Sequence, residues 1–305
     1  MSNQLVAVVG PTGSGKSDLA LNLVEALVAR GERAEIINCD SMQFYRGMDI
    51  GTAKLPVVER RGIEHHLLDW LEIRDESTAA EYQAVARPLI EKLQSEGIRP
   101  ILVGGSMLYI AAVLNNFEFP ARDEALRAEL EAELLEHGAS HMFRKLAALD
   151  DLAASRIDPK NGRRIVRAIE IVTVTGEPFA AALPEVPEEW QPSVQIGLHV
   201  DRETLVPRLH ARAEGMWRAG LLGEVEQLIP LGIREGKTSS RAIGYAQALA
   251  QLDGKLTEQE AITETALLTS RYARRQMSWF RRDSRINWFE HDDPSLVERA
   301  LESCV

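Results

Sequence analysis

The sequence predicts an α/β fold, in which a parallel sheet is flanked by helices and interrupted by a helical insertion domain. Short β-branched apolar runs at residues 4–9, 34–39 and 98–103 alternate with helical patterns, which is typical of parallel sheets. Residues 120–190 are helical in pattern and strongly charged, and strand character returns at residues 194–200. A chain of 305 residues has room for one large core that carries such an insertion.

The first predicted strand leads into a glycine-rich turn that matches the phosphate-binding P-loop motif G-x-x-x-x-G-K-S in full. A helical pattern with Leu19, Leu23 and Leu27 follows, so the motif stands between a strand and a helix. Glycines let successive backbone N–H groups surround an anion, and the helix N-terminus adds its positive dipole end. We therefore expect a P-loop NTPase-like sheet, with Lys16 at the terminal phosphate and the Ser17 hydroxyl on Mg²⁺. The phosphate-binding residues are Gly10, Pro11, Thr12, Gly13, Ser14, Gly15, Lys16 and Ser17.

The second predicted strand ends at Asp40. Ligands of open α/β sheets lie at the carboxyl ends of the strands, so Asp40 should face the same crevice as the P-loop. A carboxylate there could bind Mg²⁺ through water, orient a nucleophile or act as a general base. Aspartate and serine are also favoured helix N-caps, so Asp40-Ser41 could instead begin the next helix. From the residues alone both roles stay open.

The third predicted strand, residues 98–103, is followed by Gly104-Gly105-Ser106. These glycines permit close backbone approach to a ligand, and the serine adds a hydroxyl. A motor-type ATPase usually places a magnesium-binding acid at the end of such a strand, and none stands here. The sequence therefore disfavours that class of enzyme.

Two local patterns occur between the second and third strands. Thr78 and Glu81 have the spacing of a capping box, which predicts a helix that reaches about Glu96. His65 and His66 are adjacent in the chain and lack the i, i+4 spacing of a zinc-binding helix. We expect the two histidines to pack or to form hydrogen bonds rather than to bind a metal.

The change in pattern along the chain predicts two domains. We expect residues 1–119 and 191–305 to form the catalytic core, and residues 120–190 to form the helical insertion. Leucines spaced by four residues predict an amphipathic helix over residues 122–137. The proline-rich, acidic residues 178–192 reconnect the insertion to the core.

The charge of the chain is unevenly distributed. The 35 basic and 46 acidic residues give a net charge of −11, which taken alone argues against nucleic-acid binding. Residues 201–290, however, carry 14 basic and 12 acidic side chains, a net of +2, and residues 271–285 hold six arginines and one aspartate among Tyr272, Trp279 and Phe280. Arginines beside aromatic rings suit phosphate contact and base stacking. The alternative is a helix whose arginines pair with acids elsewhere in the chain.

Composition limits the cellular setting. Two cysteines, Cys39 and Cys304, are too few for a disulfide framework or a four-cysteine zinc site. No apolar run approaches the length of a membrane span, and the first ten residues lack the basic region of a signal peptide. We therefore expect a cytoplasmic protein without a membrane partner, and nothing in the sequence demands more than a monomer.

Eight segments, in order along nearly the whole chain, resemble the bacterial tRNA dimethylallyltransferases of the isopentenyl-tRNA transferase family. The P-loop alone would not be specific for this family, but its occurrence together with the segments at residues 40–54 and 269–281 is specific. The matching segments are GPTGSGKS (10–17), DSMQFYRGMDIGTAK (40–54), HHLLD (65–69), GGSMLY (104–109), NGRRIVRAIEI (161–171), GLLGEV (220–225), RAIGY (241–245) and TSRYARRQMSWFR (269–281).

The resemblance implies transfer of a dimethylallyl group from dimethylallyl diphosphate to N6 of the adenosine 3′-adjacent to the anticodon of tRNA. The anion in the P-loop would then be an allylic diphosphate rather than ATP. Cleavage of the C–O bond builds charge on the diphosphate, which N–H groups, Lys16 and Mg²⁺ would stabilise. The implied partner is the tRNA anticodon stem-loop, gripped by the insertion, with the target base flipped out of its stack.

The resemblance also implies roles for single residues. Asp40 is the implied general base, and Ser17 or Thr12 would reach the diphosphate and Mg²⁺. Arg212 would support the diphosphate, although the neighbouring Arg208 could be that residue instead. The implied tRNA contacts are Asp40, Ser41, Met42, Gln43, Ser106, Arg127, Lys160, Asn161, Gly162, Arg163, Arg164, Arg241, Ala242, Ile243, Gly244, Tyr245 and Ala246.

Three other functions compete with tRNA prenylation. An adenylate isopentenyltransferase prenylates free AMP, ADP or ATP, but it needs neither an RNA-gripping insertion nor an arginine-rich helix. A P-loop kinase for a small molecule would use Asp40 to activate a hydroxyl group. A regulatory nucleotide-binding module would have the P-loop without chemistry.

Overall fold

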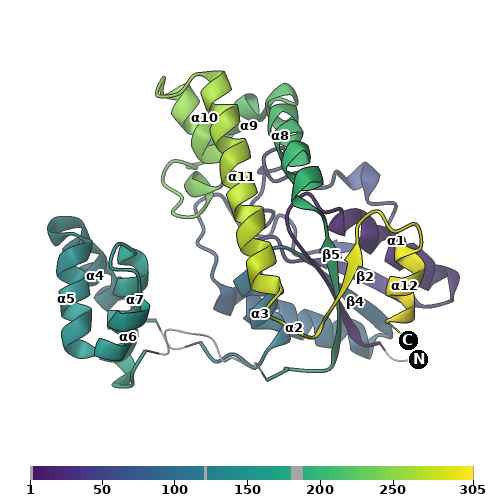
Figure 1. Ribbon diagram of the computed structural model, residues 1–305, viewed down its shortest axis with the longest axis horizontal. Helices are drawn as coiled ribbons and strands as arrows, with labels where there is room; N and C mark the ends of the chain where they lie inside the picture. The colour runs from purple at the N-terminus through teal and green to yellow at the C-terminus, as the bar shows by residue number, and fades with distance from the viewer. Residues whose placement is uncertain (1–2, 120–121, 180–187, 305) are drawn as a thin grey trace. The chain divides into compact units, whose positions relative to one another are not determined.

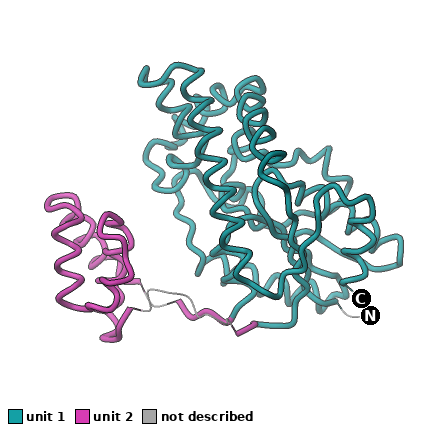
Figure 2. The backbone as a smooth tube through the Cα atoms, in the orientation of Figure 1, with its two compact units in different colours: residues 1–115, 190–305 teal, residues 116–189 magenta. Residues whose placement is uncertain are grey.

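The computed structural model divides into two compact units, which Figure 2 shows in different colours. Unit 1 comprises residues 1–115 and 190–305, and unit 2 comprises residues 116–189. The described residues are 3–119, 122–179 and 188–304. The predicted connection at residues 178–192 therefore falls largely outside the described residues.

Unit 1 is built on a six-stranded parallel sheet with the strand order β3-β2-β4-β1-β5-β6. Strand β1 lies inside the sheet, where Val8 pairs with Val103 of β4 on one side and Ile196 of β5 on the other. The strands are β1 (Leu5–Val9), β2 (Arg33–Asn38), β3 (His65–His66), β4 (Ile98–Gly104), β5 (Ser193–His199) and β6 (Ile286–Glu290). The four predicted strands and the P-loop NTPase-like sheet are confirmed, whereas the two edge strands, β3 and β6, were not predicted.

Helices cover both faces of this sheet, because successive strand residues point to opposite sides. In β1, Leu5, Ala7 and Val9 belong to one core cluster, and Val6 and Val8 belong to the other. Helices α2 and α3 pack on the first cluster, and α1 and α12 lie together on the second (Figure 1). These helices are α1 (Lys16–Ala29), α2 (Ala79–Ser95), α3 (Met107–Leu114) and α12 (Leu296–Glu302).

Helix α2 begins at the predicted capping box. The Thr78 hydroxyl accepts a hydrogen bond from the Glu81 N–H, and the Glu81 carboxylate accepts one from the Thr78 N–H at 2.9 Å. Glu96 is the C-cap, and Gly97 follows it with φ of +75°. Both predicted ends of this helix are therefore confirmed.

Residues 202–280 of unit 1 are mainly helical and follow the carboxyl end of β5. The longest of these helices, α11, has 23 residues and packs along α8 (Figure 1). Gly220 adopts φ of +97° and separates α8 from α9. The elements are α8 (Arg202–Arg218), α9 (Leu221–Leu228), α10 (Tyr245–Leu252) and α11 (Glu258–Phe280), with 3-10 turns η1 (Val57–Glu59) and η2 (Ser239–Arg241).

Unit 2 is a helical unit with its own apolar core. Its helices are α4 (Glu124–His137), α5 (Ala139–Leu149), α6 (Asp151–Arg156) and α7 (Gly162–Thr175). Gly138, with φ of +79°, allows the sharp turn between α4 and α5. Leu130, Met142, Leu146 and Ile165 are central to the core of this unit. Across the described ranges of both units, no helix has the length and apolar character needed to cross a membrane.

Candidate active site at the carboxyl edge of the sheet

The P-loop connects β1 to α1 in a conformation that only glycine adopts readily. Gly10, Gly13 and Gly15 have φ of +145°, +80° and +90°. A Cβ atom on Gly10 would also lie 2.9 Å from the Leu198 carbonyl oxygen of the neighbouring strand β5. Helix α1 begins at Lys16, so the N–H groups of its first turn have no acceptor within the helix and can bind an anion in the loop.

Three charged side chains meet beside the P-loop: Lys16 of α1, Asp40 after β2 and Arg212 of α8. Burial lowers the pKa of Lys16 to about 8; the Asp40 carboxylate opposes this shift, and the Arg212 guanidinium adds to it. Burial also lowers the pKa of Arg212, again opposed by Asp40. The Asp40 carboxylate thus interacts with both cations in a partly desolvated site, where the two cations outnumber the one carboxylate and can attract an anion.

Asp40 does not cap a helix. Its Oδ1 accepts a hydrogen bond from the Met42 N–H at 3.1 Å, and its own N–H donates to the Asn38 side chain at 3.1 Å. The residues that follow form turns rather than an α-helix, so the N-cap alternative is wrong. The carboxylate is partly buried, and its Oδ1 holds the turn after β2.

The turn after β4 is tied to the turn after β2 by two serines. The Ser106 hydroxyl accepts a hydrogen bond from the Ser41 N–H at 2.9 Å and donates one to the Ser41 hydroxyl at 3.1 Å. Tyr272 of α11 reaches the same place: burial and the Asp40 charge raise its pKa, whereas a hydrogen bond with Ser106 lowers it. The net shift is upward, so the Tyr272 hydroxyl stays protonated near the carboxylate.

The loop over residues 40–54 is hydrogen bonded to the site through Arg212. Arg212 donates a hydrogen bond from Nη2 to the Thr52 carbonyl at 3.3 Å, and Gln43 donates to the same carbonyl at 3.2 Å. The Lys54 side chain is only 3% exposed, and its ammonium group pairs with Asp49 and Asp69. These contacts fix the loop at both of its ends.

A carboxylate from α9 holds the middle of that loop. Glu224 Oε2 accepts hydrogen bonds from the N–H groups of Ile50 at 2.8 Å and Asp49 at 3.2 Å. Sequence reasoning did not single out Glu224 beyond its place in a matching segment. Residues 49 and 224 are far apart in the chain, so only the fold reveals the contact.

The predicted tRNA contacts fall on both units. In unit 1, Arg241 is exposed, Ile243 and Ala246 are partly buried, and Ala242, Gly244 and Tyr245 are buried. This segment packs against the loop at Gly51, where a Cβ atom would lie 2.4 Å from the Tyr245 ring.

In unit 2, the predicted contact Arg127 lies among acids. It pairs with Glu131 at 3.0 Å and with the fully buried Glu170 at 3.0 Å. The predicted contacts at residues 160–164 form the exposed turn that begins α7, where Asn161 caps the helix by accepting the Arg164 N–H. Arg127 thus forms structural ion pairs and is also a candidate tRNA contact, whereas the turn at residues 160–164 is exposed to solvent.

Helix α11 presents two different faces. Arg271, Arg274 and Arg275 are exposed, and none forms an ion pair with any residue that the structure describes. Arg285, beyond the helix, does pair with Asp283. The inner face carries Tyr272 and Gln276, whose i, i+4 spacing was visible in the sequence although Gln276 was not predicted as a site residue.

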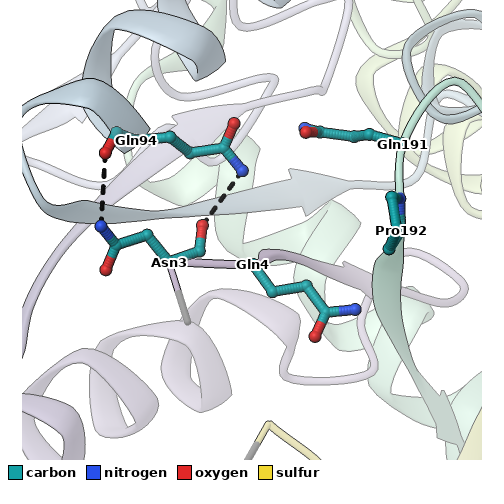
Figure 3. Close-up of a pocket in the computed structure, with 5 residues that line it drawn as sticks. All are labelled: Asn3, Gln4, Gln94, Gln191 and Pro192. Atoms are coloured by element: carbon teal, nitrogen blue, oxygen red, sulfur yellow. Dashed lines mark hydrogen bonds between the residues drawn. The ribbon is translucent and has the colours of Figure 1, made fainter. Parts of the chain in front are cut away.

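A cavity of about 410 Å³ lies at the opposite edge of the sheet, before β1 and β5 (Figure 3). Its lining is Asn3, Gln4, Gln94, Gln191 and Pro192, and Asn3 and Gln94 exchange two hydrogen bonds there. The lining has no acid, base or cation.

The protein supplies few ligands for a metal. Within the described part of the chain, no group of three or more histidine, cysteine, aspartate or glutamate residues could hold an ion. His65 and His66 form β3, where their rings hydrogen bond to the Ile63 carbonyl and to Glu35. The Ser17 hydroxyl is exposed in the first turn of α1 beside the anion cradle, a hard oxygen donor of the kind Mg²⁺ prefers.

Fold and site together define a group-transfer enzyme of the P-loop type, with a cradle for a phosphorylated substrate facing an acidic residue. The family model described as IPP transferase matches residues 43–283 of the chain. The chain belongs to the IPP transferase family, and it is therefore a prenyltransferase.

Individual relatives agree with this assignment. A tRNA dimethylallyltransferase of Nocardioides sp. is 52% identical over 297 residues, which cover 97% of this chain and 94% of the relative. The crystal structure of a tRNA isopentenylpyrophosphate transferase from Bacillus halodurans is 38% identical, with a TM-score of 0.69 over 98% of this chain and 94% of that one. A eukaryotic dimethylallyltransferase acting on tRNA is 26% identical, with a TM-score of 0.74 over 96% and 75% of the two chains.

Proposed function

We propose that this enzyme transfers a dimethylallyl group from dimethylallyl diphosphate to N6 of the adenosine 3′-adjacent to the anticodon in tRNA, and releases diphosphate. The observation that carries the proposal is the meeting of Lys16, Asp40 and Arg212 beside the P-loop. Two cations suit the diphosphate, and one carboxylate suits the amine that attacks the allyl carbon. The names of the relatives support the same donor class and the same acceptor.

The P-loop stabilises the leaving group. As the bond between C1 of the allyl group and the diphosphate oxygen breaks, the electron pair stays on that oxygen. The backbone N–H groups of the loop, Lys16 and Arg212 surround the charge that develops there. Arg212 rather than Arg208 fills this role, because burial and Asp40 affect the Arg212 side chain, whereas Arg208 is exposed on α8. The Thr12 hydroxyl, partly buried at the start of the loop, donates to the same diphosphate.

Mg²⁺ fits this donor set as a partner of the substrate. Ser17 would hold it together with oxygens of the diphosphate, because no group of three or more histidine, cysteine, aspartate or glutamate residues in the described ranges could hold the ion. When bound, the ion supplies positive charge that neutralises the diphosphate.

Asp40 is the general base for the acceptor. The N6 nitrogen forms a bond to C1 and must then lose a proton, which passes to the Asp40 carboxylate. The Met42 N–H holds one oxygen of this carboxylate in the turn after β2, and the other oxygen would accept the proton. Ser41 and Ser106 lie beside it and can contact the flipped adenosine.

The proposed tRNA contacts include cations on each unit. On unit 1 these are the exposed Arg241 and the exposed arginines of α11. On unit 2 they are Lys160, Arg163 and Arg164 of the exposed turn, together with the partly buried, ion-paired Arg127. Arginines attract the phosphate backbone of RNA, so a local basic surface is enough to bind tRNA although the net charge of the chain is −11. We infer that the enzyme grips the anticodon stem-loop in this way and acts in the cytoplasm as a monomer.

The test is incubation of the purified enzyme with Mg²⁺ and ¹⁴C-labelled dimethylallyl diphosphate, in parallel with an unmodified tRNA transcript and with AMP. We expect label in tRNA and none in AMP. A transcript whose adenosine 3′ of the anticodon is replaced by guanosine is the matched control and should stay unlabelled. Label in AMP alone would indicate an adenylate isopentenyltransferase, and phosphoryl transfer from ATP without prenylation would indicate a kinase.

A further inference from the structure

Gln276 of α11 forms hydrogen bonds with two loops of the candidate site, the P-loop after β1 and the turn after β4. It lies on the inner face of α11 and is only 2% exposed. Its Oε1 accepts a hydrogen bond from the Thr12 N–H at 2.8 Å, and its Nε2 donates one to the Gly105 carbonyl at 2.8 Å. A single carboxamide thus links the P-loop after β1 to the turn after β4.

The fit of this carboxamide is specific in chemistry and in shape. Thr12 presents a donor and Gly105 presents an acceptor, so only a group with one acceptor and one donor satisfies both. A Cβ atom on Gly105 would lie 2.2 Å from Nε2 of Gln276, so the residue at 105 has to be glycine for the contact to form. The hydrogen bond to the Gly105 carbonyl is buried and that from the Thr12 N–H is partly buried, and neither backbone group has another hydrogen-bond partner among the described residues.

Thr12 and Gly105, the two backbone partners of Gln276, each lie next to residues that the proposed function assigns to one of the two substrates. Thr12 stands at the start of the loop that holds the diphosphate in the proposed function. Gly105 precedes Ser106, whose hydroxyl holds Ser41 next to Asp40. The spacing between the donor site and the acceptor site therefore depends on the side chain that ties Thr12 to Gly105.

The same helix also carries the candidate RNA surface. Tyr272, one turn before Gln276, hydrogen bonds with Ser106, and the Arg275 guanidinium stacks on its ring at 5.6 Å from the centroid. Arg271 and Arg274 are exposed on the outer face. Helix α11 thus has one face in the crevice and one face available to a polyanion.

We propose that Gln276 is a positioning residue that sets the P-loop against the Gly105–Ser106 turn, so that C1 of the bound donor faces the acceptor amine. This inference rests on the proposed function. Gln276 acts through the Thr12 and Gly105 backbone and touches neither substrate. Reactive alignment of two substrates contributes to the rate of the chemical step, and a small misplacement is costly.

The test compares Gln276→Met with Gln94→Met, a matched control. Gln94 also donates a hydrogen bond to a backbone carbonyl, that of Asn3, at the opposite edge of the sheet. We expect Gln276→Met to lower kcat at least tenfold, with the Kd for tRNA within twofold of the parent value. Gln94→Met should keep kcat within twofold. A Gln276→Met enzyme with kcat equal to that of the control would overturn the proposal.

A double-mutant cycle separates positioning from loss of fold. Gly105→Ala should be severely impaired because its methyl group collides with Gln276, whereas the same change in a Gln276→Ala background should cost little more. Equal losses in both backgrounds would contradict the contact. Should Gln276→Met fail to fold, Gln276→Glu keeps the size and the acceptor but loses the donor, and we expect the same fall in kcat. Prenylation by the parent enzyme must be established first, since its absence would refute the proposed function and not the role of Gln276.

Discussion

The Tyr245 hydroxyl donates a 2.6 Å hydrogen bond to the Glu224 carboxylate, which in turn accepts the N–H groups of Asp49 and Ile50. An aromatic ring from α10 and a carboxylate from α9 thereby hold a loop that starts at the end of β2. The Thr52 carbonyl of this loop accepts a hydrogen bond from Arg212, so the clamp extends to the diphosphate site.

Removal of the Tyr245 hydroxyl should loosen this clamp. We expect Tyr245→Phe to lower the free energy of unfolding by about 1–2 kcal/mol, because a partly buried carboxylate loses a charged hydrogen bond. Urea denaturation of the full chain measures it. In the comparison variant Tyr45→Phe, the lost bond goes to the neutral Asp75 carbonyl, so a smaller loss of about 1 kcal/mol is expected. If the Tyr245→Phe variant has the same free energy of unfolding as the parent enzyme, the hydrogen bond from Tyr245 to Glu224 contributes nothing to stability.

The activity should fall in alkaline solution because of Lys16. Burial and Arg212 leave its pKa at about 8, below the ordinary value of 10.5. As the pH rises through 8, the free enzyme loses the ammonium charge that binds the diphosphate. We therefore expect kcat/KM for dimethylallyl diphosphate at pH 9 to be about tenfold below its plateau at pH 7. Binding of the diphosphate favours the charged form, so kcat at saturation should change less.

The control for this profile is tRNA affinity, measured by filter binding without the donor. It should stay constant within twofold over the same range of pH, since arginines keep their charge. A kcat/KM that is flat from pH 7 to 9 would remove Lys16 from the role of the phosphate-binding cation.

Asp40→Asn should separate chemistry from binding. The amide keeps the acceptor for the Met42 N–H, so the turn after β2 survives, but it cannot accept a proton at neutral pH. We expect kcat to fall about 100-fold or more, in the range typical for loss of a general base, with little change in the Kd for tRNA. Single-turnover prenylation and filter binding give the two numbers, and an unchanged kcat would exclude Asp40 as the base.

Unit 2 should depend on its buried carboxylate. Glu170 is fully buried, pairs with Arg127 and Arg167, and accepts the Asp123 N–H. Glu170→Gln removes the negative charge and leaves two cations against a neutral amide, so we expect a loss of about 3 kcal/mol in the stability of this unit.

Limited proteolysis, with cleavage sites mapped within residues 122–179, reads out that local loss. The control is Glu131→Gln on the half-exposed partner of Arg127, which should cost at most about 1 kcal/mol. Equal proteolysis of both variants would mean that burial of Glu170 adds nothing to the ion pair.

Local patterns predicted those features of the molecule that depend on neighbours in the chain. The P-loop and the capping box of α2 are encoded within a few residues, and both were placed correctly. The edge strand β6 was missed because exposed polar residues interrupt its apolar ones, so it has no continuous apolar run. It is held in the sheet by pairing with β5, which the local sequence does not show.

The site contacts that were missed are long-range. Thr12 and Gln276 are 264 residues apart, and Ile50 and Glu224 are 174 apart. A glutamine on a helix or a glutamate after a glycine carries no signal of its partner, since its role depends on which loop the fold brings beside it. For the same reason the sequence left the N-cap role of Asp40 open until the turn after β2 was seen.

The central claim is that the P-loop edge of this sheet performs N6 prenylation of tRNA. The most direct measurement is mass spectrometry of nuclease fragments from an unmodified tRNA transcript after reaction with dimethylallyl diphosphate, with the parent enzyme and with Asp40→Asn. The account predicts one added dimethylallyl group, on N6 of the adenosine 3′-adjacent to the anticodon, and at least 100-fold slower formation by the variant. A dimethylallyl group on another nucleotide, or equal rates for the two enzymes, would contradict it.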